Sequence, residues 1–459
     1  MSRIALVLAT AALLAACTTT PAPSPRSVAA PGAFTHATAT ADEPVAEFWR
    51  RFGDAELDAL MAQALAANLD LRIAAARVAE ARALVQGTEG LGRPNLDATA
   101  NANRIRERDS NGDPSSRNAF GVGLATKWEI DLFGRIGNEQ RAASATLAAS
   151  EAQQRAVQVS VAAEVARNYF ELRGLQEQLR VVRLDLGTQR EALKLVQARL
   201  DAGRTTALDT ERAKALVEGT AASVPALETA LARTRMRLAV LTGASPTALD
   251  ARLAEQKPLP GLPATALDAI GTPETLLARR PDVAAAEAQL RAAEARSGSA
   301  RAALYPSLTL SGTLGLNAGR IGDLGDSASF AYNLGASLLW SLIDNGQRRS
   351  QVTAADARRD AALAQFDQAV LAALEETEGA LLAFTRSQQR TEHLFAAAQA
   401  AEAAATIARA RFDAGTIDFL TLLDAERELL QARDRLAQAQ TAAATSLVAV
   451  YRSLAGGWR

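Results

Sequence analysis

Cysteine, histidine and aromatic residues are scarce in this chain of 459 residues. It has one cysteine (Cys17) and two histidines (His36 and His393), and aromatic residues make up only 4% of it. These counts exclude a cysteine- or histidine-rich metal site within one chain, and we assign neither histidine a role. The sequence also lacks a phosphate-binding glycine loop, an HExxH helix and a nucleophile elbow. We therefore expect neither catalysis nor a bound cofactor.

An excess of charge of either sign is missing too. The 50 Lys and Arg residues oppose 51 Asp and Glu residues, which leaves a net charge of −1. This balance gives no electrostatic reason to expect a nucleic-acid partner. Charged residues nevertheless make up 22% of the chain, and much of its apolar fraction is alanine. That composition favours long, solvated helices in narrow packing over a broad globular core.

Long hydrophobic runs are limited to one short stretch at the start, Ile4 to Ala16, which is too short to span a membrane as a helix. It follows Arg3 and leads into Cys17 through small residues, a pattern that resembles a bacterial lipobox. We predict a signal peptide over 1–16 and lipidation of Cys17, and the residue that follows, Thr rather than Asp, points to the outer membrane. An ordinary signal peptide with an incidental cysteine is the alternative. Residues 17–44, rich in Thr, Ala, Pro and Ser, are expected to form the lipidated N-terminus and a flexible tether. Any further membrane span must be made of β-strands.

An internal repeat organises the rest of the chain. Five anchors recur at one constant offset in residue number. They are Asp70 and Asp282, Pro94 and Pro306, Trp128 and Trp340, Gly134 and Gly346, and the Asp-Ala-Gly runs 201–203 and 413–415. We place the first structural repeat at 45–242 and the second at 274–459. Residues 243–273, which contain five prolines, are predicted to be an irregular connector without helix.

Each repeat contains one pair of alternating segments, at about 95–128 and about 307–340. Polar and apolar residues alternate there with the period of a β-strand, over about 10–12 residues per strand, the length of a transmembrane strand. Trp128 and Trp340 end equivalent strands, where an aromatic girdle would lie. If the apolar face meets lipid, the lumen-facing residues are Asp97, Thr99, Asn101, Asn103, Thr309, Ser311 and Thr313. Two soluble amphipathic hairpins packed on each other are the alternative.

A very long helix follows each hairpin. From about Asn138 to Ala202 the apolar residues step alternately by three and four, as in a coiled-coil seam, with Asn168 and Gln189 in the gaps. About 65 residues at 1.5 Å each give a length of about 100 Å. Each long helix is expected to end at a glycine, Gly203 or Gly415, beyond which the chain turns and returns as helix.

These lengths predict an assembly. Four transmembrane strands cannot close a barrel, and open strand edges in lipid are prohibitively costly. Three chains would supply a 12-stranded barrel, joined to a long periplasmic α-helical barrel. The predicted fold is therefore mainly α with a transmembrane β part, four β-strands per chain and two internal repeats. A membrane barrel continued by a hollow helical cylinder is a conduit.

Four segments carry a family resemblance: Leu276 to Val283, Tyr305 to Leu308, Trp128 to Gly134, and Arg411 to Arg427. They resemble signature segments of the TolC-like outer-membrane efflux proteins, and the lipidated NodT-type branch fits best, over about residues 45–457. The resemblance implies a trimeric channel-tunnel that passively conducts drugs or other small solutes. It implies as partners two further copies of the chain, outer-membrane lipid, a periplasmic adaptor (membrane fusion) protein and a proton-driven inner-membrane pump of the RND type.

The resemblance also implies roles for the two helical tips. The turns at Gly203, Arg204 and Gly415 would dock the adaptor, and Asp418 would form the periplasmic gate. Arg411 and Asp413 are further gate candidates by charge, since Arg204, Asp209, Arg411 and Asp413 could pair across the tips. Three Asp418 carboxylates around a threefold axis would repel one another and bind cations. The alternative is that Asp418 only caps the return helix and that the charged residues are solvated. Its counterpart in the first repeat is Thr206, so the two tips differ chemically.

A second function remains open from sequence alone. A long periplasmic coiled-coil lipoprotein without a pore, acting as an adaptor or a structural element, would also carry helical hairpins and a lipid anchor. It would not need two membrane-length strand hairpins or the duplication.

Overall fold

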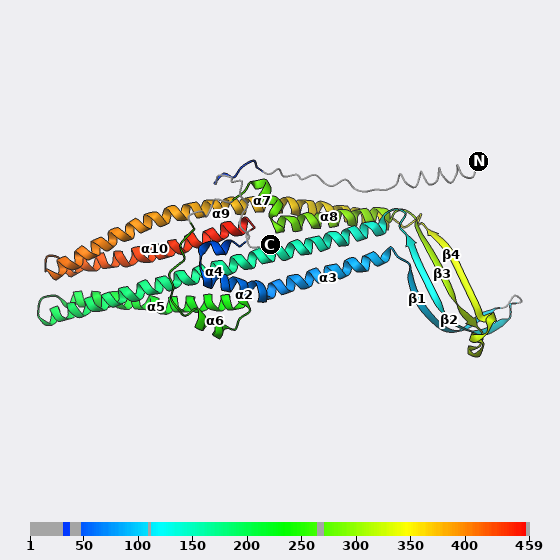
Figure 1. Cartoon of the computed structure of the whole chain (residues 1–459), viewed down its shortest axis with the longest axis horizontal. Helices are drawn as coiled ribbons and strands as arrows, with labels where there is room; N and C mark the ends of the chain where they lie inside the picture. The colour runs from blue at the N-terminus through cyan, green and yellow to red at the C-terminus, as the bar shows by residue number, and fades with distance from the viewer. Residues whose placement is uncertain (1–30, 37–46, 109–111, 264–269, 456–459) are drawn as a thin grey trace. The chain divides into compact units, whose positions relative to one another are not determined.

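The computed structural model describes residues 31–36, 47–108, 112–263 and 270–455, and Figure 1 shows the chain. Among these residues, no helix is both long enough and apolar enough to cross a membrane. The first repeat contains η1 (Phe48–Phe52), α2 (Ala55–Ala67), α3 (Leu69–Leu91), β1 (Asn95–Arg108), β2 (Pro114–Ile130), α4 (Arg135–Asp201) and α5 (Ala207–Thr242). The remaining elements are α6 (Pro246–Arg252), α7 (Pro273–Arg279), α8 (Pro281–Ala302), β3 (Ser307–Ala318), η2 (Ile321–Gly325), η3 (Ser327–Ser329), β4 (Phe330–Leu339), α9 (Gln347–Asp413) and α10 (Phe419–Ser453).

The chain divides into two compact units. The strand unit comprises the described parts of 76–151 and 284–368, and the helical unit comprises the described parts of 28–75, 152–283 and 369–459. Because the four helices α3, α4, α8 and α9 each contribute residues to both units, neither unit corresponds to one repeat. Each unit combines matching pieces of both repeats.

The strand unit contains one antiparallel sheet with the order β1-β2-β3-β4. Each hairpin pairs its own two strands, and β2 pairs with β3 to join the repeats. The polar segment predicted to turn the first hairpin, Arg106 to Asn118, is mostly strand. Residues 106–108 pair with 114–116, so both ends of the predicted turn segment belong to the strands. The expectation there is wrong because alternating Arg and Glu side chains are compatible with a solvated strand end.

The strand register collects polar residues on one face of the sheet. Asp97 lies opposite Ala125, which lies opposite Thr313, which in turn lies opposite Asn333. Residues directly opposite one another in a ladder share a face, and alternate residues along a strand share it too. All seven residues predicted to face the lumen therefore lie on a single face. The opposite face carries Leu96, Val122, Leu314, Leu334 and Leu338, all exposed in the single chain.

Two tryptophans connect the strands to the residues that precede each hairpin. The indole Nε1 of Trp128 donates to the Gly92 carbonyl at 2.9 Å, and that of Trp340 donates to the Leu304 carbonyl at 3.2 Å. Gly92 follows α3 and Leu304 follows α8, so the two bonds are repeat equivalents. Each bond ties the end of a hairpin's second strand to the residues just before its first strand.

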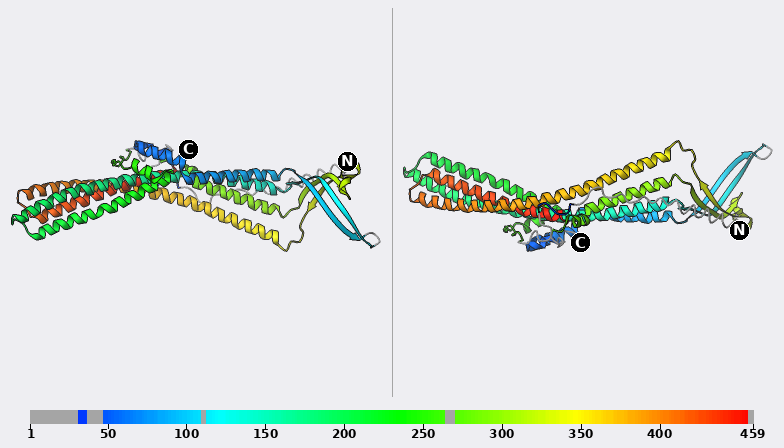
Figure 2. Two further views of the ribbon diagram at one scale, coloured as in Figure 1. Left: turned by 90° about the horizontal axis from the view of Figure 1, so that it is seen from below. Right: turned by 90° about the horizontal axis from the view of Figure 1, so that it is seen from above.

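Two helical hairpins, α4 with α5 and α9 with α10, form one end of the helical unit, and their turns lie side by side at that end (Figures 1 and 2). The predicted seam of α4 is confirmed, since Val161, Val165, Leu179 and Val196 are all buried. Asn168 and Gln189, in the gaps of that seam, are buried as well. The helix thus packs its stripe along its whole length within this unit.

The repeat offset recurs in the elements themselves. Helices α4 and α9 have 67 residues each and begin at equivalent positions of the two repeats, Arg135 and Gln347. The return helices α5 and α10 also begin at equivalent positions, Ala207 and Phe419. The predicted connector differs from expectation, because residues 246–252 form α6. Ser245 caps this helix and Pro246 occupies its first turn, a place where proline starts a helix rather than breaking one.

The main core of the helical unit lies where η1 and α2 meet α4 and α10. Phe48 stacks on Tyr451 with ring centroids 4.9 Å apart, and both side chains are buried. Phe34 joins this core, and the backbone N–H of Thr35 donates to Glu378 Oε1 at 2.6 Å. The expectation of a flexible tether over 17–44 is therefore wrong at residues 31–36. Phe34 is the only aromatic residue of that segment, so it is the residue that gains most from burial.

Candidate functional site

Both tip turns are Schellman motifs centred on a glycine. Gly203 has a φ of 70° and Gly415 a φ of 72°, in the left-handed region that favours glycine. In the first tip, the N–H of Arg204 donates to the Arg199 carbonyl and that of Gly203 to the Leu200 carbonyl. The second tip repeats both bonds at the equivalent residues. These bonds satisfy the last carbonyls of each long helix and turn the chain into its return helix.

The two return helices are capped by the same residue pair in opposite order. In the first tip, Thr206 is the N-cap of α5 and its hydroxyl donates to Asp209 Oδ2 at 2.8 Å. In the second tip, Asp418 is the N-cap of α10 and accepts from the N–H of Thr421 at 2.9 Å and from its hydroxyl at 2.5 Å. Threonine and aspartate have thus exchanged places within the cap. Both tips therefore carry a cap carboxylate, which belongs to Asp209 in the first tip and to Asp418 in the second.

These bonds also set the ionisation of the tip carboxylates. The side-chain and backbone hydrogen bonds from Thr421 hold the pKa of Asp418 below its ordinary value, while the Asp209 carboxylate acts in the opposite direction. Hydrogen bonds from Thr205 and Thr206 lower the pKa of Asp209 in the same way. Both tip aspartates are therefore ionised at neutral pH.

Arg199 joins the two tips. Its Nη2 donates to the Phe412 carbonyl at 3.2 Å, and its guanidinium carbon lies 4.0 Å from the centre of the Phe412 ring. A small apolar cluster surrounds this contact, with one or more residues from each of the four helices: Val196, Ala213, Ala408, Phe412, Phe419, Leu422 and Leu423. Sequence reasoning missed Arg199. Its repeat equivalence to Arg411, which was selected, could have identified it.

The other tip residues selected from sequence are exposed. Arg204, Arg411 and Asp413 all lie at the surface of the single chain. Among the described residues, the ion pairs near the tips involve other side chains, and none joins these three to one another or to Asp209. The structure therefore does not bring them together within one chain.

A second contact between the hairpins lies further from the tips. Arg433 of α10 binds Asp185 of α4 at 3.1 Å and Glu402 of α9 at 2.9 Å. Asp185 is buried, and burial raises the pKa of its carboxyl although Arg433 acts in the opposite direction. Its Oδ2 atom has no hydrogen-bond partner among the described residues. The pair links the two repeats within one chain.

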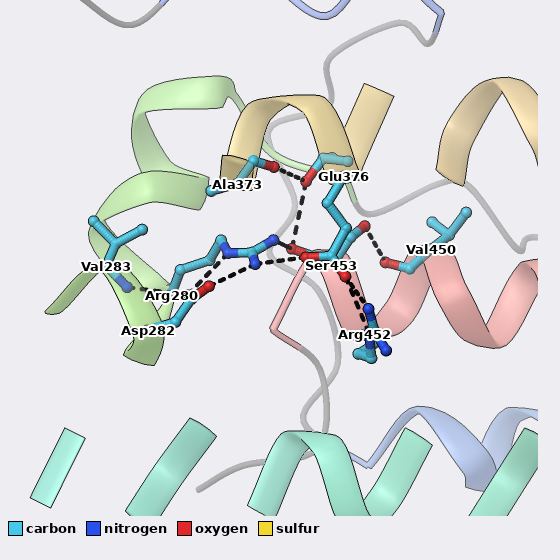
Figure 3. A network of polar contacts seen from close by, with 9 residues as sticks. Arg280, Asp282, Val283, Ala373, Glu376, Val450, Arg452 and Ser453 are labelled. Atoms are coloured by element: carbon cyan, nitrogen blue, oxygen red, sulfur yellow. Dashed lines mark hydrogen bonds and ion pairs between the residues drawn. The ribbon is translucent and has the colours of Figure 1, made fainter. Parts of the chain in front are cut away.

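The Arg-Pro-Asp segment selected from sequence forms a polar network in the helical unit (Figure 3). Arg280 is only 7% exposed and donates to Asp282, to Glu376 Oε2 at 2.7 Å and to the Ser453 carbonyl at 2.9 Å. Arg452 also binds Glu376. The first repeat replaces Arg280 with Asn68, whose Nδ2 donates to the Leu241 carbonyl at 2.9 Å, the equivalent of Ser453. The position thus joins a short helix to the end of a return helix in both repeats.

Two glycines of β2 lie on the polar face of the sheet, where Gly121 is opposite Asn101 and Asn317. A Cβ on Gly121 would lie 2.5 Å from Asn101 Oδ1 and 2.6 Å from Asn317 Oδ1. A Cβ on Gly123 would lie 2.9 Å from the Cα of Gly315, its partner across the ladder. Glycine therefore lets two asparagine side chains cover the β2 backbone. Larger residues would push the asparagines off this face.

The remaining predicted positions can be placed briefly. Cys17 lies outside the described residues. Among the described residues, no cluster of three or more His, Cys, Asp or Glu side chains could hold a metal ion.

Long helical hairpins and a four-stranded sheet with one polar face are the features expected of an outer-membrane channel protein. The family model described as outer membrane efflux protein matches the chain twice, at residues 60–244 and 272–456, and the chain belongs to that family. The pyoverdine export outer membrane protein OpmQ of Pseudomonas aeruginosa is 34% identical over 461 residues, which cover 97% of this chain and 95% of OpmQ. The two family matches begin at equivalent positions of the two repeats.

Two further comparisons agree. The solved structure of the outer-membrane channel OprN has 39% identity and a TM-score of 0.89, and the match covers 96% of this chain and 99% of that chain. The probable outer membrane lipoprotein SilC of Salmonella typhimurium is 27% identical, over 89% of this chain and 88% of SilC. The predicted fold class, the predicted outer-membrane location and the predicted efflux-channel function are confirmed. The family consists of channel proteins, which favours the channel over the poreless lipoprotein.

Proposed function

We propose that three copies of this chain form the outer-membrane duct of a tripartite efflux system. The observation that carries this proposal is the register of the sheet, which places polar residues of all four strands on one face. The sheet of one chain ends at β1 and β4, whose outer edges have no strand partner among the described residues. Open edges are unfavourable in lipid, so each edge calls for the complementary edge of another copy. Three chains close a ring of twelve strands around a lumen lined by Asp97, Thr99, Asn101, Asn103, Thr309, Ser311 and Thr313.

The tips are the end that meets the periplasmic adaptor. The turns at Gly203, Arg204 and Gly415 present exposed backbone and charge for docking, and Asp418 contributes a ring of three carboxylates that narrows the duct. Arg411 and Asp413 lie beside that ring. Solutes pass from an inner-membrane pump through the adaptor into this duct, and the chain itself supplies no energy. A proton-driven pump of the RND type fits this arrangement.

The test is reconstitution of the purified, full-length protein. Native mass spectrometry in detergent is expected to give a trimer, and planar bilayers containing it are expected to conduct ions. Because the tips of the intact protein restrict flow, the Asp418→Ala variant is measured alongside. Trimers that never conduct, with or without the tip change, would contradict the proposal.

The N-terminus anchors the assembly in lipid through Cys17. The support is the lipobox-like sequence before Cys17 and the similarity to a relative named as a lipoprotein. Mass spectrometry of the mature N-terminal peptide is expected to show a diacylglyceryl group on Cys17 and loss of residues 1–16. An unmodified cysteine, or cleavage elsewhere, would contradict the anchor and leave the channel proposal intact.

A further inference from the structure

The contact between the two tips of one chain has an equivalent that a single chain cannot form. Arg199 of the first repeat reaches the Phe412 carbonyl of the second. The repeat offset converts Arg199 into Arg411 and Phe412 into Leu200. In a ring of alternating first and second repeats, each second tip faces the first tip of the next copy. The equivalent contact therefore joins Arg411 to Leu200 of another chain.

The backbone around both arginines is the same. Arg199 and Arg411 each supply the carbonyl that accepts the long Schellman bond, from Arg204 at 2.8 Å and from Thr416 at 2.9 Å. The Phe412 carbonyl accepts two hydrogen bonds, one from Gly415 and one from Arg199. Among the described residues, the Leu200 carbonyl accepts only the bond from Gly203. A carbonyl oxygen has two lone pairs, so Leu200 keeps one acceptor position open.

The face of α4 that contains Asp185, Gln189 and Arg199 and the equivalent face of α9 differ in how exposed they are. In α4, Asp185 and Gln189 are 7% and 5% exposed because the second hairpin covers them. Their counterparts in α9 are Ala397, which is exposed, and Ala401, which is half-buried. Arg199 is half-buried while Arg411 is exposed. The same face is thus covered in the first repeat and open in the second, and its alanines permit close approach of another helix.

We propose that the face of α9 containing Ala397, Ala401 and Arg411 packs against the first tip of a second copy of this chain, with the Arg411 guanidinium donating to the Leu200 carbonyl of that copy. This inference rests on the assembly proposed above. It adds to the position of Arg411 beside the Asp418 ring a role in the contact between chains.

The contact between the two hairpins of one chain and the contact between hairpins of neighbouring chains, the two kinds of joint, differ in strength. Within a chain, Arg199 has an aromatic ring beneath it, and Arg433 adds an ion pair to buried Asp185. Between chains, the ring is replaced by Leu200 and the ion pair by Ala221 and Ala397. The joints between chains are the weaker ones, and opening of the tips begins there.

Chemical cross-linking tests the contact directly. The full-length Leu200→Cys/Arg411→Cys protein is treated with a short bismaleimide, after native mass spectrometry has shown the assembly to be intact. Denaturing gels are expected to show species of two and three linked chains. The single variants measure any reaction through Cys17, the only natural cysteine. In the control pair Leu200→Cys/Arg390→Cys, the α9 cysteine lies about 21 residues, or about 32 Å, further along the helix and is expected to give no linked chains.

The outcomes separate this inference from the assembly on which it rests. An intact trimer without linked chains in the Leu200/Arg411 pair would overturn the contact alone. Equal linking in the Arg390 control pair would overturn it as well. A protein that stays monomeric before cross-linking would overturn the proposed trimer, and this contact with it.

Discussion

At the scale of single residues, Asp418 combines two tasks that substitution can separate. Its carboxylate caps α10 and would also contribute charge to a ring at the tip. Asparagine keeps the acceptor oxygen of the cap but removes the charge, whereas alanine removes both. We expect Asp418→Asn and Asp418→Ala both to raise single-channel conductance and to lower cation selectivity in planar bilayers. The matched control is Asp209→Asn in the first tip, which is expected to leave selectivity unchanged. If only the alanine variant differs from the natural protein, Asp418 is a cap and the gate lies elsewhere.

Arg280 is a buried charged residue whose loss is expected to lower stability. Replacement by methionine leaves the Asp282 carboxylate without its cation and the Ser453 carbonyl without its side-chain donor, while Glu376 keeps only Arg452. Because the Asp282 and Glu376 side chains are partly exposed, we expect a cost of about 1–3 kcal/mol of unfolding free energy. Arg82→Met removes an exposed pair with Glu151 and is expected to cost at most about 1 kcal/mol. Denaturant unfolding of both variants at neutral pH measures the difference, and equal costs would show that the network is not stabilising.

The same network predicts how stability depends on pH. Burial opposes ionisation of Asp282, but the hydrogen bonds and charge of Arg280 outweigh it and lower the pKa of this carboxyl. For Glu376, burial is likewise outweighed, by Arg452 and Arg280, and its pKa is lowered as well. A lowered pKa in the folded state stabilises the protein above the ordinary carboxyl pKa, and this contribution is lost as pH falls through the lowered values. Melting temperatures measured below about pH 5 are expected to fall less steeply in Arg280→Met than in the natural protein.

At the scale of elements, the tip turns depend on left-handed glycine. Gly203 and Gly415 have open space around them, so an added Cβ meets no neighbour and only the backbone conformation opposes it. Alanine at either position is expected to lower the unfolding free energy by about 1 kcal/mol and to speed hydrogen exchange at that tip. Gly219 lies inside α5, also with open space, and Gly219→Ala is expected to stabilise by about 0.4–1 kcal/mol. A loss of unfolding free energy at the tip glycines together with a gain at Gly219 would identify backbone conformation as the cause. Changes of the same sign at all three glycines would exclude it.

The long elements could be predicted from sequence because one local rule governs each of them. A three-four apolar step fixed the buried stripe of α4, and an alternating pattern placed the polar residues of four strands on one face. The short elements were less predictable. α6 begins at a Ser-Pro pair that also marks turns, and Phe34 docks on the core through contacts far along the chain. Such cases depend on tertiary packing that a local pattern does not contain.

The partners of the candidate site were the least predictable part. Nothing near Arg199 in sequence indicates that it contacts Phe412, 213 residues away. The exchange of Thr206 and Asp209 for Asp418 and Thr421 is visible in the aligned repeats, yet its meaning requires the cap geometry. Sequence comparison of the two repeats therefore identified where the tips differ, and the structure explained how.

At the scale of the whole molecule, two identical repeats would make all joints between hairpins equal, and this chain departs from that symmetry. One departure is the ion pair between Asp185 of α4 and Arg433 of α10, whose counterparts between chains are Ala397 and Ala221. A duct that must open without dissociating needs firm joints inside each chain and weaker joints that can yield. Duplication followed by divergence at a few positions provides both kinds of joint from one interface.

This asymmetry can be reversed by design. Arg433 lies between Asp185 and Glu402, whereas the counterpart of Glu402 in the first repeat is Arg190, so the new pair needs the opposite polarity. In the Ala221→Glu/Ala397→Arg variant, Glu at 221 is expected to bind Arg190 of its own chain and Arg at 397 of the next. The two changes should stabilise the trimer together by about 0.5–3 kcal/mol more than the sum of their separate effects. A double-mutant cycle on thermal dissociation of the trimer measures this coupling. The double variant should also conduct less than the natural protein. The like-charged control Ala221→Glu/Ala397→Glu should weaken the trimer instead. Additive effects in both variants would place positions 221 and 397 apart in the assembly. Stabilising coupling in the Glu/Arg variant together with destabilising coupling in the Glu/Glu control would identify the contact between chains as the part of the tip that opens.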